Sequence, residues 1–191
     1  MLHVIRNPFD AILSFYSFDE THSHTEKTKT FIPIDKLTWY VKQYSDHYLY
    51  WANVPTSRML VKYEDLKSDA VNELRRVNRF LLSPPLGSMT DMFVPDDKAI
   101  RCAVGDDSVL PYKSSTSKMN IMHGIDDLDR VQVKYIVESL AEIMCGLGYA
   151  EMYNVHRQNR AQLGEDVGPY LDCFKDSVNT VISFITRPVA Q

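Results

Sequence analysis

The chain has 191 residues, of which 45% are hydrophobic and 24% are charged, so it is long enough to bury a core and has the composition of an ordinary globular protein. Its net charge of -4 provides no general attraction to nucleic acid or to an anionic membrane surface, and any anion must therefore be bound at a local site. No apolar run is long enough to span a bilayer, and the first residues lack the pattern of a secretory leader. We therefore expect neither a nucleic-acid partner nor a transmembrane segment in this chain.

The three cysteines, Cys102, Cys145 and Cys173, are widely separated and form no pair with the spacing of a metal or redox motif. One disulfide with a remaining thiol and three reduced thiols both fit this count. The cysteines therefore leave the cellular compartment open.

The first part of the chain reads as a short buried strand over residues 2–5, followed by a helix from Pro8 to about Phe18. Asn7 is a suitable N-cap, Pro8 suits the first helical position, and Asp10 can reach back as the acid of a capping box. The sequence thus predicts a well-defined turn between the strand and the helix.

The middle of the chain begins with an exposed polar loop over residues 19–33 and an aromatic-rich helix over residues 35–52. A short apolar strand over residues 58–63 follows, and residues 64–66 read as a solvated acidic turn at its end. An amphipathic helix is expected over residues 69–82. Its apolar stripe consists of Val71, Leu74, Val77, Phe80 and Leu81.

The second half of the chain contains an expected short helix over residues 87–93, a loop over residues 103–119 and a long helix over residues 126–145 that two glycines end. Residues 170–185 have the pattern of one further amphipathic helix.

The order of these elements, strand, helix, helix, strand, helix, predicts an α/β fold in three layers with parallel strands. We expect one domain over residues 1–150 and a C-terminal tail over residues 151–191 that is helical in part.

The most informative motif lies where the first strand meets its helix. It places Arg6 at the end of the strand and Ser14 inside the helix. Because a helix N-terminus attracts anions and an arginine fork grips phosphate, this arrangement is that of a phosphate clamp. The plainer alternative is a capped helix with Arg6 as a solvated charge.

The string Arg-Asn-Pro-x-Asp-x-x-x-Ser-x-Tyr over residues 6–16 resembles the 3′-phosphate-binding motif of sulfotransferases that use 3′-phosphoadenosine 5′-phosphosulfate (PAPS). The resemblance implies that Arg6 and Ser14 hold the 3′-phosphate of this nucleotide. The strand that ends in Tyr63-Glu64-Asp65-Leu66 is similar to a second recurrent, mainly structural segment of the same family.

The aromatic helix, with Trp39, His47 and Trp51, resembles that of membrane-anchored Golgi carbohydrate and protein sulfotransferases, in particular the WSC-domain-containing members. The resemblance covers residues 2–149 and points to the Golgi lumen, with the cytoplasm as the alternative. The aromatic side chains fit core packing better than an acceptor platform, and His47 fits a packed or capping role better than that of a base.

The family implies a P-loop-NTPase-like three-layer fold. Its phosphosulfate loop carries a P-loop-like pattern, which does not occur in this sequence, and we therefore expect the chain to lack that loop and the strand before it. The late basic loop of the family corresponds here to the segment with Lys113, our third candidate for nucleotide binding, and Arg101 and Lys118 are further candidates. No catalytic residue is assigned, and the chemistry needs no metal.

The function implied by the resemblance is transfer of a sulfuryl group from PAPS to a hydroxyl or amine, with a carbohydrate or a protein as the acceptor. We expect the chain to correspond to the C-terminal part of a sulfotransferase domain, and a truncated domain, a split domain and an inactive descendant all stay open as explanations. The alternative is a noncatalytic nucleotide-binding or interaction protein on the same fold. A nucleotide kinase is disfavoured, because the sequence has neither a Walker A motif nor a convincing set of Mg²⁺ carboxylates.

Overall fold

The computed structural model describes residues 1–22, 31–54, 58–82, 98–99, 123–162 and 169–173. The chain divides into two compact units, one of Met1–Arg6 and Ser57–Ile121 and the other of Asn7–Thr56 and Met122–Gln191. We call them the sheet unit and the helical unit, and describe each by itself.

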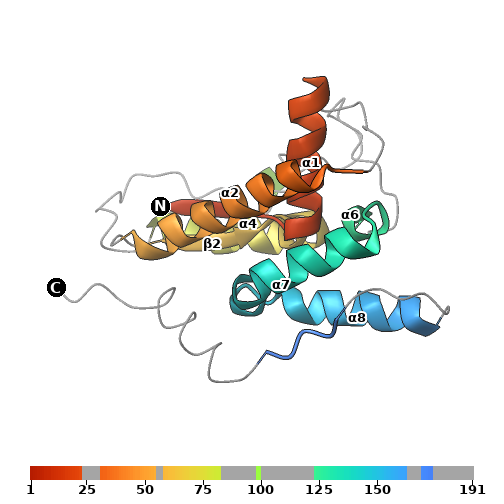
Figure 1. Cartoon of the computed structure of the whole chain (residues 1–191). Coiled ribbons are helices and arrows are strands. Elements are labelled where there is room, and N and C mark those ends of the chain that lie inside the picture. Colours follow the sequence, from red (N-terminus) through yellow and green to blue (C-terminus); the bar gives the residue numbers. More distant parts are fainter. Residues whose placement is uncertain (23–30, 55–57, 83–97, 100–122, 163–168, 174–191) are drawn as a thin grey trace. The chain divides into compact units, whose positions relative to one another are not determined.

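The sheet unit is built on two parallel strands, β1 (Leu2–Ile5) and β2 (Met59–Lys62). Their register pairs Leu2 with Met59 and Ile5 with Lys62, and the two strands lie side by side in Figure 1. This parallel pairing together with the helices agrees with the expected α/β class, whereas the three-layer, P-loop-like arrangement stays a prediction.

Directly after β2, the described part of the sheet unit continues with the helices α3 (Tyr63–Ser68) and α4 (Ala70–Leu82). The expectation of a solvated acidic turn after β2 is wrong, because Glu64 and Asp65 occupy the first turn of α3. Acidic side chains are favourable there, since they face the positive end of the helix dipole, and Lys67 complements its other end.

Helix α4 is tied to β2 through Arg76. The Nη2 atom of Arg76 donates to the carbonyl oxygen of Leu60 at 2.8 Å, and its Nε atom donates to the carboxylate of Glu73 at 3.0 Å. Glu73 is buried, and its carboxylate raises the pKa of Arg76 by accepting hydrogen bonds from the guanidinium group. The expected apolar stripe is half-buried, except for Leu81, which is exposed.

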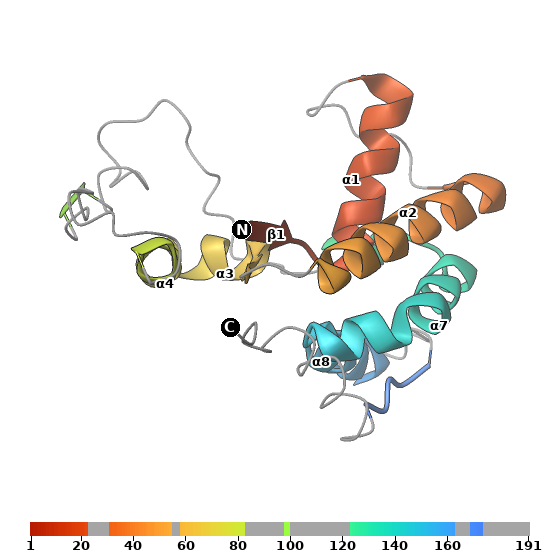
Figure 2. The same ribbon diagram turned by 90° about the vertical axis from the view of Figure 1, so that its left-hand side faces the viewer.

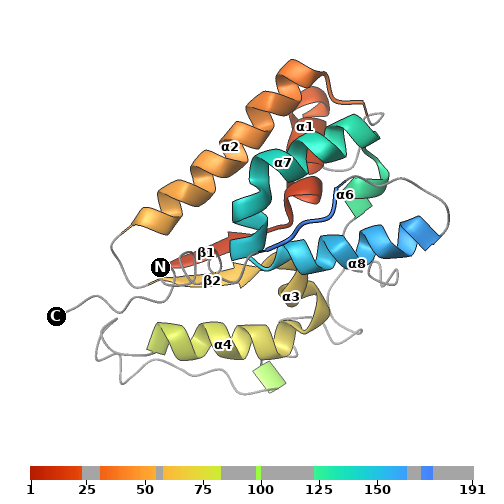
Figure 3. The same cartoon turned by 60° about the horizontal axis from the view of Figure 1, so that its bottom comes forward.

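The helical unit contains five described helices: α1 (Pro8–Thr21), α2 (Ile34–Asn53), α6 (His123–Asp126), α7 (Arg130–Gly146) and α8 (Tyr149–Gln162). Helices α1 and α2 pack on each other and on α7 (Figure 2), and α8 runs beside α7 (Figure 3). None of the helices in the described part of the chain is both long and apolar enough to cross a membrane. The largest buried side chains of this unit include Phe9, Ile32, Leu37, Ile136, Leu140, Met144, Tyr149 and Tyr153.

Two helix boundaries differ from the expectation. Helix α1 continues to Thr21, where His22 adopts a left-handed conformation (φ 51°) and donates its backbone N–H to the carbonyl oxygen of Phe18. The expected long helix from residue 126 is divided, because Asp129 and Gln132 form a reciprocal capping box that starts α7 at Arg130.

The last described segment, residues 169–173, is extended and lies against α8. The amide of Asn154 donates to the carbonyl oxygen of Leu171 at 2.7 Å and accepts from its backbone N–H at 3.0 Å. Cys173 is joined to Cys145 of α7 by a disulfide. The expected helix over 170–185 is therefore wrong for its first four residues, and the remainder of that range lies outside the described residues. The boundary expected between residues 150 and 151 falls inside α8.

Tyr153→Phe should destabilise the helical unit by about 1 kcal/mol, the usual contribution of one internal hydrogen bond. The Tyr153 hydroxyl donates to the carbonyl oxygen of Pro169 at 2.9 Å, and burial raises the pKa of this hydroxyl to about 12. Since the folded pKa lies above the unfolded value, this contribution is complete below about pH 10 and is lost as the pH rises to 12. Urea unfolding of both proteins from pH 8 to 11.5 should show this loss in the wild type alone, and an identical pH dependence in the variant would contradict the assignment.

Candidate functional site

The carboxyl edge of the two strands carries the first candidate, Arg6. Because Ile5 pairs with Lys62, Arg6 leaves β1 at the edge where Tyr63 leaves β2. The guanidinium carbon of Arg6 lies 5.0 Å from the centroid of the Tyr63 ring, and Nζ of Lys67 lies 5.7 Å from the same centroid. Ligands of open α/β sheets bind beyond the carboxyl ends of the strands, and two cations gathered there favour an anionic one.

Arg6 is half-buried, and its position against the Tyr63 ring limits the orientations of its guanidinium group. The plainer alternative, a capped helix with Arg6 as a solvated charge, stays open, because a half-buried side chain keeps contact with solvent. A guanidinium held in one orientation presents its donors as a fixed fork, which suits the oxygens of a phosphate.

The first turn of α1, in the helical unit, begins at the expected N-cap. Asn7 is fully buried, and its Oδ1 atom accepts the backbone N–H of Asp10 at 2.9 Å, as the capping motif predicts. The acid of the expected capping box bonds differently, because Oδ2 of Asp10 accepts from the side-chain Nδ2 of Asn7 at 2.9 Å, whereas a capping box uses the backbone N–H of the N-cap. Pro8 occupies the first helical position.

Ser14, the second candidate, lies in the middle of α1 with its side chain exposed. It is therefore accessible to a ligand from solvent. Arg6 belongs to the sheet unit and Ser14 to the helical unit, and the structure describes each candidate within its own unit.

The third candidate, Lys113, lies outside the described residues, as do Arg101 and Lys118. The expected short helix over 87–93 and the loop over 103–119 also lie outside the described part of the chain.

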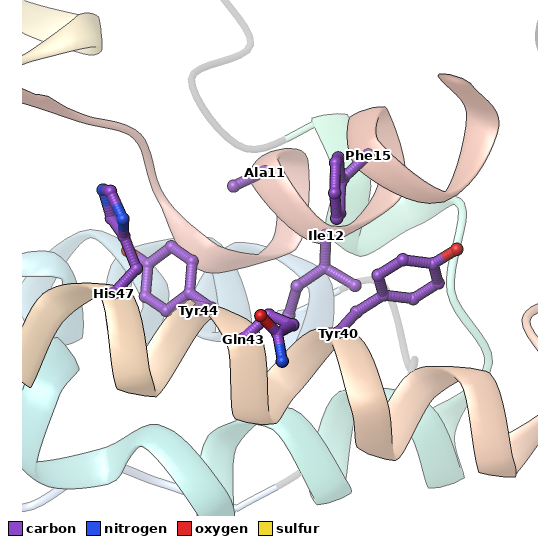
Figure 4. A pocket seen from close by; sticks show the side chains of 7 residues that line it. All are labelled: Ala11, Ile12, Phe15, Tyr40, Gln43, Tyr44 and His47. Atoms are coloured by element: carbon purple, nitrogen blue, oxygen red, sulfur yellow. The ribbon is translucent and has the colours of Figure 1, made fainter. Parts of the chain in front are cut away.

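A pocket of about 360 Å³ lies between α1 and α2 in the helical unit. Figure 4 shows the side chains of Ile12 and Phe15 directed from α1 towards α2, whose residues form the opposite wall. Its lining is mostly apolar and aromatic, with two polar side chains, a composition typical of small-molecule sites. The lining residues are Ala11, Ile12, Phe15, Tyr40, Gln43, Tyr44 and His47.

The aromatic side chains of α2 divide between core and surface. Tyr40 and Tyr48 are buried, whereas Trp39 is exposed and stacks on Phe15 with ring centroids 6.1 Å apart. His47 is exposed at the pocket and contacts the ring of Trp51. The helix therefore combines core packing with an aromatic surface beside the pocket.

The Tyr40 hydroxyl at the pocket is held in its neutral form. Burial raises the pKa of Tyr40, and its hydrogen bond to Oδ2 of Asp19 at 2.7 Å raises it further. The hydroxyl proton of Tyr40 is thus donated to Asp19, and the ring of Tyr40 forms part of the pocket wall.

Sequence reasoning missed three residues around these candidates. Tyr63 was expected at the end of a strand, and Lys67 was given no role. Both lie in α3, where the Tyr63 ring contacts the Arg6 guanidinium and the Lys67 ammonium group. Gly124 donates its backbone N–H to Oδ1 of Asp10 at 2.6 Å, across 114 residues of sequence. Local sequence patterns carry no signal for a contact between residues so far apart.

Among the described residues, no group of three or more His, Cys, Asp or Glu side chains is placed to hold a metal ion.

Comparison with known proteins gives one family. Residues 1–93 match the model of a family described as sulfotransferase domain, and this confirms the resemblance found in the motifs at residues 6–16 and 60–66. Neither the search of curated proteins nor the search of solved structures gave a match.

Proposed function

We propose, from the premise that residues 1–93 belong to the sulfotransferase domain family, that this chain takes part in sulfuryl transfer from PAPS to a hydroxyl or amine acceptor. We further propose that Arg6 and Ser14 bind the 3′-phosphate of the nucleotide. The observation that carries the proposal is the Arg6 guanidinium, held against Tyr63 at the carboxyl edge of the parallel strands in the family-matched range.

Each proposed contact has a distinct physical role. Arg6 supplies a charge-assisted fork whose orientation the Tyr63 ring restricts before the ligand arrives. Ser14 supplies an exposed hydroxyl that can donate to a phosphate oxygen. Lys113, in the segment expected to be the late basic loop, is proposed as a third contact.

PAPS supplies the sulfuryl group, and this chain contributes binding and orientation at the far end of the nucleotide. Binding energy from a part of the substrate remote from the reacting atoms can be used to orient the reacting end. We therefore expect loss of the 3′-phosphate contacts to lower the rate of transfer as well as the affinity.

We propose that the pocket between α1 and α2 in the helical unit binds the acceptor. Its aromatic walls and its polar side chains, Gln43 and His47, fit a ligand that combines apolar surface with hydroxyl groups. A carbohydrate and a protein side chain both have this character.

From the resemblance we propose the Golgi lumen as the compartment, with the cytoplasm as the alternative, and the WSC-domain-containing members as the related branch of the family. The disulfide between Cys145 and Cys173 supports an oxidising compartment, because disulfides persist there and are rare in the cytosol. The branch is proposed only from the resemblance carried by Trp39, His47 and Trp51 in α2.

Arg6→Ala should weaken the binding of adenosine 3′,5′-bisphosphate, the nucleotide product, by about 1.5–3 kcal/mol, or roughly 10- to 100-fold. Equilibrium dialysis with labelled nucleotide measures the loss. Arg6→Lys, which keeps the charge but not the fork, should fall between the wild type and Arg6→Ala.

The matched control is Arg79→Ala, which removes the same charge from an exposed position in the same unit. Equal losses in Arg6→Ala and Arg79→Ala would show a general charge effect and contradict the assignment. Nucleotide binding without transfer from labelled PAPS to any acceptor would favour the noncatalytic alternative.

A further inference from the structure

The Asp10 carboxylate is buried in the first turn of α1, and both of its oxygen atoms accept hydrogen bonds from within the chain. Oδ2 accepts from the side chain of Asn7 at 2.9 Å, and Oδ1 accepts from the backbone N–H of Gly124 at 2.6 Å. A carboxylate used in this way is unsuited to a ligand contact, and instead it joins two parts of the chain.

Gly124, the second residue of α6, approaches the backbone of α1 too closely for any side chain. A Cβ atom placed on Gly124 would lie 2.8 Å from three atoms, namely Oδ1 of Asp10 and the carbonyl carbon and oxygen of Phe9. Two of these atoms are backbone atoms of α1 and cannot move without moving the helix. The glycine is therefore required by the close approach of the two backbones.

Helix α6 is fixed at its other end by α8. Oδ1 of Asp126 lies 3.2 Å from Nε2 of His156 and 3.3 Å from Nη1 of Arg160. Helix α8 also reaches α1 directly, because the ring of Tyr153 stacks on Phe9 with centroids 5.7 Å apart. The first turn of α1 is thus held by two elements that are themselves joined to each other.

We infer that Gly124 and Asp10 are positioning residues for 3′-phosphate recognition, because their contact fixes the start of the helix that carries Ser14. The inference rests on the proposed function, and it adds that residues outside the family-matched range 1–93 complete the site. Neither residue touches the nucleotide.

The test compares two nucleotides that differ only in the 3′-phosphate, adenosine 3′,5′-bisphosphate and adenosine 5′-phosphate. The ratio of their dissociation constants reports recognition of the 3′-phosphate alone. We expect at least tenfold preference for the bisphosphate in the wild type, and loss of about tenfold of this preference in Gly124→Ala with the affinity for adenosine 5′-phosphate unchanged. Displacements of about an ångström in a binding constellation commonly have effects of this size or larger.

The control is Gly146→Ala, at the last residue of α7, where the backbone φ is not positive. It adds a methyl group to the same unit and should keep the wild-type ratio. If circular dichroism shows that Gly124→Ala does not fold, the same ratio of dissociation constants is measured for Asp10→Asn, which then tests the inference. An asparagine at residue 10 presents an NH₂ group to one of the two donors and therefore breaks one of the two hydrogen bonds.

The outcomes separate the two proposals. If the wild type prefers the bisphosphate and Gly124→Ala or Asp10→Asn keeps this preference, the positioning role is overturned and the proposed function stands. An equal loss of affinity for both nucleotides shows a general structural role and also overturns it. A folded wild type that does not distinguish the two nucleotides contradicts the proposed function, and the inference with it.

Discussion

Replacing Phe9 by alanine should destabilise the helical unit by about 3–5 kcal/mol, the range found when large aromatic side chains are removed from protein cores. Phe9 lies in the first turn of α1, is 0% exposed, and stacks on the ring of Tyr153. Its loss leaves a cavity beside the Tyr153 ring of α8, and a close-packed core fills such a cavity only in part. Urea unfolding followed by far-ultraviolet circular dichroism measures the change.

The control for this prediction is Phe15→Ala on the same helix. Phe15 is 48% exposed, although it stacks on Trp39 and meets Tyr40 edge-on. We expect a cost of about 1 kcal/mol, because much less apolar surface leaves the protein interior. Equal effects of the two substitutions would contradict the placement of Phe9 in the core.

Removing the disulfide should cost about 3–4 kcal/mol of folding free energy in the variant Cys145→Ser/Cys173→Ser. The two cysteines are 28 residues apart, and the chain-entropy estimate for a loop of this length gives that value. The disulfide connects the end of α7 to the segment that Asn154 holds against α8, so its loss should also loosen residues 169–173. Urea unfolding with and without a reductant measures the stability of the wild type against that of the variant.

The oxidation state itself gives an independent check. Thiol titration of the denatured, unreduced protein should find one of the three cysteines reactive. Three reactive thiols in protein prepared from an oxidising compartment would contradict the disulfide.

Local chemistry made the first part of the fold predictable. The strand at residues 2–5, the N-cap at Asn7 and the proline at the first helical position follow from neighbouring residues, and the structure confirms their positions. The expected burial of the strand is wrong except at Ile5, because Leu2 and Val4 are exposed. The long aromatic helix was also predictable, since α2 begins and ends within one residue of the expected positions. Helix capping and helical periodicity depend on residues that are close together in the sequence, so these elements can be predicted from it.

The sequence could not reveal features that depend on distant or competing contacts. Acidic residues are favourable both in the first turn of a helix and in a solvated turn, so Glu64 and Asp65 could not show from the sequence that residues 63–68 form α3. The segment at Leu171 is extended because Asn154, 17 residues earlier, pairs with its backbone. The contact between Asp10 and Gly124 spans 114 residues, and no residue pattern near Gly124 predicts it.

Some residues of the candidate site could be predicted from the sequence, and others are identified only by the structure. Arg6 and Ser14 were proposed from a single string of residues, and their roles stay proposals. The ring of Tyr63, which restricts the Arg6 guanidinium, became visible only once β1 and β2 were paired in register. Pairing between strands more than fifty residues apart cannot be read from either strand alone.

The measurement that tests the central claim most directly is calorimetric titration of the wild-type chain with adenosine 3′,5′-bisphosphate. We expect saturable binding of one nucleotide per chain, weakened by added salt because the contact is charged. Heat of dilution alone, from protein that circular dichroism and cooperative unfolding show to be folded, would contradict the claim that this chain binds the nucleotide of sulfuryl transfer.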